Sequence, residues 1–502
     1  MLYANTDKLT KNKHCIAIVC NQWGDTGKGK FVDLFSDWAD VIVRGTGGGN
    51  AGHTLVVNDQ RYIFHLIPSG ILYDSIGKIN VIGRGVAFDP RILCEELEIL
   101  NQSKKSYNNL KISHEAPLML PYHLLVDRIN DKSEKVGTTG RGIGPLYSDY
   151  YARKSLFVND MLNKDLFAKK LRKFLAEKEA ILKSLNKELA KKVLSHEHLC
   201  NGAFFDKKKV LNLDSIVEFY TGQFAEQLSH FITETSKIAK DTLHRQRNVL
   251  LEGAQGTLLS IDYGTTRYQT SSDCSIEGLA KGSGLKEKNV DLVLGITKAF
   301  YMTRVGNGPF PTEFGGKHGE TWCDKMKKEE EQKEFTSNLE DLLNDEENTL
   351  GQGIATRILG NEYGATTGRL RRTGWLDLVA LEYSMGINGK HLALTKLDVL
   401  SKMKKIKLCT SYTYHGSDMV YADQILENGD IIDEFPRFSE ILEKCEPNYL
   451  EFDGWMSDIY GETSLERLPK QLMHILEVIE NLTGAHIDII STGPDRNHTI
   501  VR

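Results

Sequence analysis

Short apolar segments alternate with amphipathic ones along most of this 502-residue chain. Runs rich in β-branched residues predict buried strands, and leucines at helical spacing after Asp89-Pro90 predict a helix that begins at this proline. Strands and helices in alternation are typical of an α/β protein whose large, mostly parallel central sheet is flanked by helices. The predicted strands are 16–19, 62–67, 80–83, 249–252, 291–300, 391–394 and 487–490.

Two segments depart from this alternation. Residues 165–247 carry apolar positions at helical spacing among lysines and glutamates, which predicts amphipathic helices that pack on the outside of the sheet. Residues 316–351 hold runs of charge with few apolar positions, which is typical of an exposed excursion, and we assign it no chemistry. We therefore expect one domain, residues 1–502, with a helical excursion and a charged insertion.

A glycine-rich loop follows the first predicted strand and precedes a helix. From Gly24 to Lys30 it satisfies most of the G-x-x-x-x-G-K pattern, in which backbone N–H groups and a lysine bind phosphates. Phe31 stands where the ordinary P-loop has a metal-binding hydroxyl. The loop therefore predicts a P-loop-like phosphate-binding fold in which Asp25 is the candidate oxygen ligand for Mg²⁺.

Further polar loops follow predicted strands, at the places where open α/β sheets bind their ligands. Residues 47–54 combine four glycines with a histidine, and 364–374 holds three arginines, which suit a clamp for carboxylate or phosphate groups. Lys396 and Asp398 fit guanine, because a carboxylate can accept from both N1–H and N2–H₂ of that base. Similar glycine-bearing loops are 136–145 and 491–494.

Composition narrows the class of protein. With 63 basic and 68 acidic residues the formal charge is −5, which argues against a dedicated nucleic-acid binder. The eight cysteines are scattered without a C-x-x-C pair, which favours reduced thiols in the cytoplasm. No apolar run has the length of a membrane span, and residues 1–14 lack the apolar segment of a signal peptide. We expect a cytoplasmic protein with neither a nucleic-acid nor a membrane partner.

Taken in order, these loops resemble those of the adenylosuccinate synthetase family over nearly the whole chain. The matching segments are 22–25, 50–54, 137–145, 252–259, 308–313, 364–374, 394–400 and 493–496. The resemblance implies GTP-dependent ligation of IMP and L-aspartate to adenylosuccinate, the first committed step of AMP synthesis from IMP. It also implies a 6-phosphoryl-IMP intermediate, release of GDP and phosphate, a Mg²⁺ ion and a homodimer.

The resemblance further implies roles for single residues. Asp25 matches the general base at N1 of IMP, His53 the acid that hydrogen-bonds the moving phosphoryl group, and Gln255 the residue that supports the 6-position. Asp25 and the carbonyl of Gly52 match the Mg²⁺ ligands. The implied GTP contacts are Gly24, Gly27, Lys28, Gly29, Lys30, Gly52, His53, Thr54, Arg371, Lys396, Asp398, Ser491 and Gly493. The implied IMP contacts are Asp25, Lys28, Asn50, His53, Thr139, Gln255, Thr270, Arg369 and, from the neighbouring subunit, Arg153. The implied L-aspartate contacts are Ala365, Thr366, Thr367, Arg369 and Arg371.

Three features depart from the family pattern, and two alternative functions stay open. Thr26 stands where the family usually has Glu, Gly49 where it has a polar residue, and 316–351 is longer than the usual connection. One alternative is a relative that acts on another purine nucleotide such as dGMP, which the presence of Asp25 disfavours. The other is a GTP-binding regulatory protein without catalysis, which would bind GTP without any phosphate release that depends on IMP and aspartate.

Overall fold

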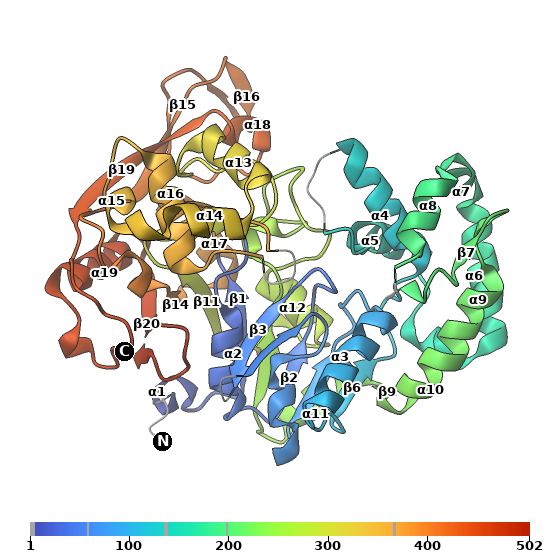
Figure 1. The fold of residues 1–502 in the computed structure, drawn as a ribbon. Coiled ribbons are helices and arrows are strands. Elements are labelled where there is room, and N and C mark those ends of the chain that lie inside the picture. Colours follow the sequence, from blue (N-terminus) through green and yellow to red (C-terminus); the bar gives the residue numbers. More distant parts are fainter. Residues whose placement is uncertain (1–5, 58–59, 135–138, 197–198, 365–367) are drawn as a thin grey trace.

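A ten-stranded sheet lies at the centre of the computed structural model, which describes residues 6–57, 60–134, 139–196, 199–364 and 368–502 (Figure 1). Neighbouring strands are parallel except for the pair β20–β21 at one edge. In spatial order the strands are β21 (Thr499–Val501), β20 (His486–Ser491), β14 (His391–Thr395), β11 (Leu292–Lys298), β1 (Cys15–Cys20), β10 (Val249–Glu252), β2 (Val41–Arg44), β5 (Ile79–Ile82), β6 (Leu110–Ser113) and β9 (Ile232–Thr233). The prediction of a large, mostly parallel sheet is confirmed, and six of the seven predicted strands belong to it. The strand predicted at 62–67 lies instead in a separate two-stranded antiparallel hairpin.

Helices cover both faces of this sheet. In β1, Ile16 packs in a buried cluster with α2, whereas its neighbour Ala17 packs in another with α11 and α12. Because successive strand residues point to opposite faces, a strand covered on both sides must be apolar throughout. The helices packed near the sheet are α1 (Asp7–Thr10), α2 (Lys28–Ser36), α3 (Pro90–Gln102), α11 (Thr235–His244), α12 (Ile276–Gly282), α17 (Leu378–Asn388) and α19 (Lys470–Thr483).

The 165–247 segment is helical, as predicted. The further prediction that its helices pack on the outside of the sheet is wrong for most of them. Its helices form a lobe beyond the β6 edge (Figure 1), and Ile112 of β6 shares one buried cluster with Phe167 and Tyr220 of the lobe. The apolar faces of these helices are therefore buried largely against one another, although α11 returns to the sheet and β9 extends it. The lobe contains α4 (Pro121–Glu134), α5 (Ile143–Tyr151), α6 (Lys164–Glu177), α7 (Glu179–Ser184), α8 (Lys187–Leu194), α9 (Leu213–Glu218), α10 (Ala225–Leu228), β7 (Phe205–Asp206) and β8 (Val210–Leu211).

A second, smaller sheet is absent from the sequence-based prediction. It separates from the first because the predicted strand 291–300 turns at Phe300, whose φ is +66°. The next residues pair with the end of the arginine-rich segment, Tyr301 with Trp375. Its strands are β12 (Tyr301–Arg304), β13 (Arg372–Asp377), β15 (Lys405–Tyr414), β18 (Ile431–Ile432) and β19 (Cys445–Asp453), beside the hairpin β16 (Met419–Tyr421) and β17 (Gln424–Leu426) and the short α18 (Ser439–Leu442).

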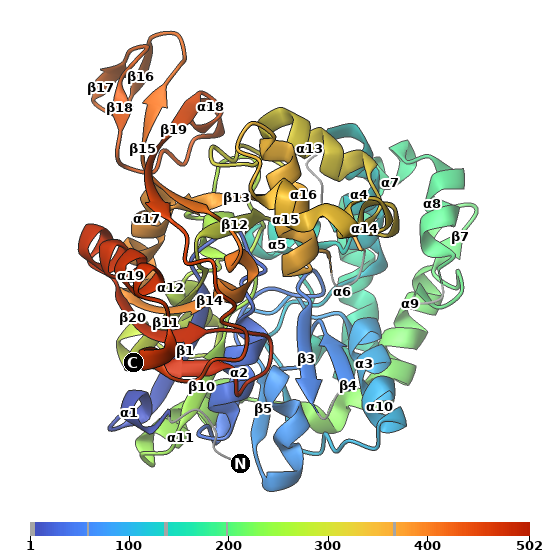
Figure 2. The same cartoon turned by 60° about the vertical axis from the view of Figure 1, so that its left-hand side comes forward.

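The charged insertion folds into helices beside β12 and β13 (Figure 2). Most of its side chains are at least partly exposed, as predicted, but Glu331 and Leu343 are buried. The helices are α13 (Gly316–Lys325), α14 (Lys328–Phe335), α15 (Leu339–Leu343) and α16 (Thr349–Gly360). Among the helices in the described ranges, none is both long and apolar enough to cross a membrane.

Candidate active site

The loop between β1 and α2 has the backbone shape of a phosphate site. Gly24 and Gly27 have φ of +88° and +86°, in the left-handed region that favours glycine. A Cβ on Gly29 would lie 3.0 Å from the carbonyl oxygen of Thr54, so this glycine lets the start of α2 approach the second glycine-rich loop. The structure therefore brings the first two predicted loops together at the carboxyl end of β1.

Asp25 lies in this loop with φ of +52° and a partly exposed side chain. Its Oδ2 accepts a hydrogen bond of 2.5 Å from Nε of Arg371. Burial alone raises the pKa of Asp25, but the charges of Arg371, Lys298 and Lys28 outweigh burial and hold this pKa below its usual value. The carboxylate is therefore ionised at neutral pH, as a base or a metal ligand must be.

His53 opens β3 (His53–Val57), which pairs with β4 (Gln60–Phe64), and its Nδ1 contacts Oε1 of Glu252. Glu252 is fully buried at the end of β10 and also accepts from the N–H and the hydroxyl of Ser69, both at 2.8 Å. Burial and the nearby Arg44 lower the pKa of His53 to about 4. Burial opposes ionisation of Glu252, but His53 and Arg44 outweigh it and lower its pKa to about 2. At neutral pH the imidazole is thus neutral, with its Nδ1 proton on the side of a carboxylate that can only accept.

Glu252 and Arg44 are functional candidates to which the sequence analysis assigns no role. Each stands at the end of an apolar strand, β10 and β2, and the guanidinium of Arg44 lies 3.8 Å from Oε1 of Glu252. The sequence does contain a signal for Glu252 and Arg44, namely a charged residue at the end of an apolar strand. Charged side chains are seldom buried without a partner, so such a residue is a candidate for a functional contact.

Gln255 and Asn50 present unpaired polar atoms to the same region. Both amide atoms of Gln255 are buried without a partner in the described part of the chain, and Lys28 Nζ donates to its backbone carbonyl at 2.5 Å. Asn50 donates to the hydroxyl of Thr270 at 3.3 Å, while its own Oδ1 is buried and unpaired within the described ranges. Buried polar groups normally have a partner, so these two amides are suited to binding a polar ligand.

The loops after β14 and β20 form the end of the site predicted for guanine. Lys30 does not point to open solvent: its Nζ donates to Ser491 Oγ at 2.6 Å and to the carbonyls of Gly493 and His498, each at 2.8 Å. Burial lowers the pKa of Lys30 to about 7, against the opposing charge of Asp398. Asp398 Oδ1 is buried and has no hydrogen-bond partner among the residues described.

Next to this end, Lys396 adopts a left-handed conformation (φ +64°), and its Nζ donates to the carbonyl of Gly360 at 2.6 Å. Burial raises the pKa of Asp398, and the positive charges of Lys396 and Lys30 act against that rise. The carboxylate of Asp398 therefore lies near two cations and has one oxygen without a hydrogen-bond donor among the residues described. Such a carboxylate can accept hydrogen bonds from the N–H groups of a base.

The arginine-rich segment is not one loop with three equivalent arginines. Arg371 binds Asp25, and the exposed Arg369 donates to Asp324 at 2.7 Å and to Asn307 at 3.2 Å. The third, Arg372, begins β13 and is buried in a bidentate pair with Glu313, so its prediction as part of the oxyanion clamp is wrong. Ala365, Thr366 and Thr367 lie outside the described residues.

Arg153 and Thr139 are both exposed. Arg153 follows α5 with φ of +62°, and within the described ranges its side chain forms no ion pair. This placement brings neither residue into the cluster around Asp25 in a single chain.

Comparison with known proteins decides the family. A family model described as Adenylosuccinate synthetase matches residues 17–500. The chain belongs to the adenylosuccinate synthetase family. Curated adenylosuccinate synthetases include that of Thermoanaerobacter sp. (strain X514), 40% identical over 490 residues, 97% of this chain and 98% of the relative. That of Clostridium novyi (strain NT) is 39% identical over 486 residues, 96% and 97% of the two chains.

Solved structures agree with this assignment. The fully ligated adenylosuccinate synthetase of Plasmodium falciparum superposes with a TM-score of 0.75 at 31% identity, over 97% of this chain and 100% of the other. A cyanophage S-2L succinoaminodeoxyadenylate synthetase bound to dGMP has a TM-score of 0.51 at 18% identity, which indicates a shared fold. As a member of the family, this adenylosuccinate synthetase ligates IMP and L-aspartate at the expense of GTP, in the synthesis of AMP.

Of two departures from the usual family sequence, the one at Gly49 has a local structural explanation. A Cβ on Gly49 would lie 2.4 Å from Cδ1 of Ile92, so Ile92 of α3 fills the space that a side chain would need. Thr26 is fully buried, and its carbonyl accepts from the hydroxyl of Thr395 at 3.0 Å. Nothing in the structure explains why a threonine replaces glutamate at position 26.

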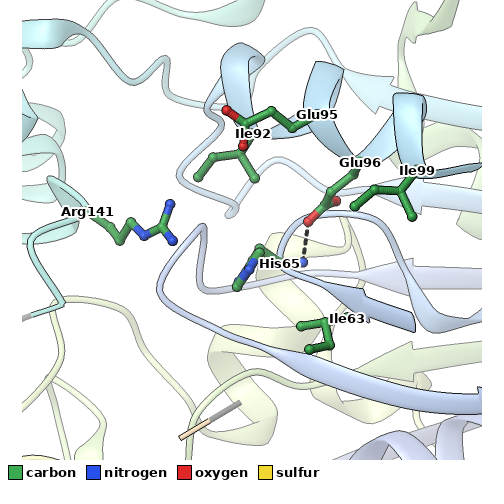
Figure 3. Close-up of a pocket in the computed structure, with 7 residues that line it drawn as sticks. All are labelled: Ile63, His65, Ile92, Glu95, Glu96, Ile99 and Arg141. Carbon is green, nitrogen blue, oxygen red and sulfur yellow. Dashed lines mark hydrogen bonds between the residues drawn. The ribbon is translucent and has the colours of Figure 1, made fainter. Parts of the chain in front are cut away.

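Beside the hairpin of β3 and β4 lies a cavity of about 250 Å³ (Figure 3). Glu96 of α3 closes one side and accepts from the backbone N–H groups of His65, Leu66 and Ile67. Burial raises the pKa of Glu96 to about 7 despite these bonds. Arg141 extends toward it from the opposite side; the lining residues are Ile63, His65, Ile92, Glu95, Glu96, Ile99 and Arg141.

Proposed function

We propose that Asp25, His53 and Gln255 carry out the ligation through a 6-phosphoryl-IMP intermediate. Asp25 removes the N1 proton of IMP, which makes O6 the nucleophile that attacks the γ-phosphorus of GTP, and the bond to GDP breaks. The amine of L-aspartate then attacks C6, phosphate leaves with the former O6, and the nitrogen of the new C–N bond gives up one proton to solvent. The ionised carboxylate of Asp25 supports this role, because a base must be deprotonated before it acts.

The buried and unpaired amide of Gln255 supports the proposal most strongly. It lies next to the phosphate loop, since Lys28 of that loop bonds the carbonyl of the same residue. Its amide can hydrogen-bond the 6-position of IMP, and Asn50, tied to Thr270, can meet the rest of the nucleotide. Lys28 Nζ is placed to stabilise the transferring phosphoryl group electrostatically.

His53 changes its protonation in this scheme. Its pKa of about 4 reflects burial and Arg44, and a γ-phosphoryl group brought near Nε2 adds negative charge that raises this pKa. Glu252 on Nδ1 stabilises the imidazolium as it forms, and the proton on Nε2 then bonds the moving phosphoryl group. Glu252 acts as a positioning residue here, because its own contacts fix the imidazole ring.

Mg²⁺ fits the residues at the loop. Asp25 offers a partly exposed, ionised carboxylate oxygen, and Gly52, directly before His53, offers an exposed backbone carbonyl. Oxygen ligands and nucleotide phosphates are the ligands that Mg²⁺ prefers. When bound, the ion neutralises part of the phosphate charge of GTP.

We assign the remaining contacts by the same reasoning. Arg369 and Arg371 bind the carboxylates of L-aspartate, and we assign Ala365, Thr366 and Thr367 to the same substrate. Asp398 and Lys396 bind guanine, Gly24, Gly27, Gly29, Thr54, Ser491 and Gly493 line the rest of the GTP site, and Thr139 contacts IMP. Arg153, exposed in one chain, reaches the IMP phosphate of the partner in a closed dimer. The scattered cysteines and balanced charge support work in the cytoplasm on small molecules.

An assay with omitted substrates tests the function. With IMP, GTP, L-aspartate and Mg²⁺, we expect adenylosuccinate and phosphate in equal amounts, and neither product when any one substrate is omitted. Phosphate release without dependence on IMP and aspartate would indicate a GTP-binding regulatory protein instead. Faster turnover with dGMP than with IMP would indicate the other nucleotide-ligating branch.

A further inference from the structure

We propose that the charged insertion is part of the active-site architecture: buried Glu331, through Arg357, positions the segment that carries Arg369 and Arg371. The inference rests on the proposed function, in which these two arginines bind substrate. The insertion comprises residues 316–351, and the two arginines themselves lie outside it.

Glu331 is the centre of this arrangement. It lies on α14 among exposed glutamates and lysines, yet it is fully buried. Its two oxygens accept from Nε of Arg357 at 3.0 and 3.1 Å and from Nη2 of the same guanidinium at 2.7 Å. The indole N–H of Trp322 donates to it at 2.8 Å. A buried carboxylate so fully hydrogen-bonded fixes the orientation of the guanidinium that it holds.

Arg357 passes this orientation to the substrate-binding segment. It lies on α16, is nearly fully buried, and its Nη1 donates to the backbone carbonyl of Arg371 at 3.0 Å. The side chain of that same residue reaches Asp25 at 2.5 Å. Two hydrogen bonds therefore separate Glu331 of the insertion from the arginine that contacts the proposed base.

Glu331 also contacts the chain just before the arginine-bearing segment. The hydroxyl of Tyr363 donates to Oε2 of Glu331 at 3.0 Å, and Tyr363 forms an isolated antiparallel bridge with Leu370, which gives this part of the chain a hairpin form. Arg369 on this hairpin pairs with Asp324 of α13. One buried carboxylate thus ties the residues on both sides of the hairpin, and α13 contacts its exposed arginine.

These contacts have a specific consequence for catalysis. A small displacement of a binding group lowers the rate steeply, because productive geometry is lost even while the contact survives. Guanine recognition by Asp398 belongs to a different element, the turn Leu397–Leu400 after β14. The contact of neighbouring Lys396 with α16 uses the backbone carbonyl of Gly360 and does not involve the Arg357 side chain. Loss of the Arg357 fork should therefore impair use of L-aspartate while preference for GTP over ATP is retained.

The test variant is Arg357→Lys, which keeps a positive charge beside Glu331 but removes the planar fork that reaches the carbonyl of Arg371. We expect kcat/KM for L-aspartate to fall about tenfold or more, with the GTP:ATP ratio of kcat/KM unchanged. Glu330→Gln is the matched control, because Glu330 is the exposed neighbour, 3.8 Å from Lys327, and we expect wild-type kinetics from it. Tm, followed by circular dichroism, reports whether each variant is folded.

An Arg357→Lys enzyme that is folded and within about twofold of wild type in kcat/KM for L-aspartate would overturn the inference. So would a parallel loss of aspartate use and GTP preference, since that pattern indicates general loosening. If Arg357→Lys does not fold, Tyr363→Phe removes one hydrogen bond to Glu331 and keeps the ring, and the same two criteria decide. The wild-type enzyme is assayed first: no adenylosuccinate there refutes the proposed function, whereas an active wild type with unaffected variants refutes the positioning role alone.

Discussion

Asp398 should determine the choice of nucleotide, and substitution by asparagine should redirect it. Its Oδ1 is buried with no partner in the described part of the chain, beside the cations Lys396 and Lys30. Guanine presents N1–H and N2–H₂ as two adjacent donors to one carboxylate, whereas adenine presents a lone pair at N1. GTP thus satisfies Asp398, and ATP leaves its carboxylate unpaired.

The expected magnitude follows from two hydrogen bonds to a charged acceptor. Each contributes about 1.5–3 kcal/mol, so the loss of both with ATP amounts to about 3–6 kcal/mol, a factor on the order of 10²–10⁴ in kcat/KM. ITP lacks the N2 amine but keeps N1–H, so it loses one bond and about 10- to 150-fold. In Asp398→Asn the side-chain amide can donate to a C2 carbonyl, so the variant should prefer xanthosine triphosphate to GTP.

The assay is adenylosuccinate formation at saturating IMP and L-aspartate, with GTP, ITP, ATP and xanthosine triphosphate varied in turn. The ranking GTP, then ITP, then ATP for wild type, with xanthosine triphosphate first for Asp398→Asn, supports the assignment. Equal kcat/KM for GTP and ATP in the wild-type enzyme would refute it. So would an Asp398→Asn variant that still discriminates as sharply as wild type.

Three further predictions follow from the same site. Asp25→Asn should lower kcat by about 10²–10⁴-fold with the circular dichroism spectrum unchanged, because the base and a metal ligand are lost together; activity within a few-fold of wild type would contradict the role of Asp25. The pKa of His53 is about 4 in the folded protein, whereas its ordinary value is 6.5. As the pH falls, His53 is therefore protonated in the unfolded chain before it is protonated in the folded protein. The stabilisation that is present above pH 6.5 is thus lost as the pH falls toward 4. The loss is about 3 kcal/mol in the free energy of unfolding by urea; a His53→Gln variant with the same decline across this window would contradict it. Arg153→Leu should raise KM for IMP and leave KM for GTP nearly unchanged, and mixing it with Asp25→Asn should restore some activity through heterodimers; no restoration in a mixture that exchanges subunits would remove the cross-subunit role.

Local pattern predicted much of this fold, and the long-range pairings explain what it missed. Strands such as β1 are covered on both faces and therefore stand out as apolar runs. The second sheet escaped prediction because the left-handed Phe300 divides one apolar run between two sheets. In the site, the glycine loops were predicted from composition and spacing. Glu252 was not, because its role arises from contact with His53, 199 positions away in sequence.

The charged insertion shows the same limit at one residue. Glu331 belongs to a run of three glutamates in which nothing local distinguishes it from its neighbours. Its burial results from packing against Arg357, which lies on a later helix. A run of charged residues usually indicates an exposed helix face. That Glu331 is buried can be recognised only from the tertiary packing of the helices.

The position of β1 in the sheet has a consequence for biosynthesis. This strand is translated early, yet Cys15 pairs with Val249 and Ile16 pairs with Leu292. At about 5–20 residues per second, the ribosome needs roughly ten seconds to a minute to deliver these partners. During that interval an apolar strand with two unpaired edges is held in a nascent chain, with no sheet to receive it. The time that the ribosome needs to synthesise β10 and β11 therefore sets the period in which the nascent protein is most prone to aggregation.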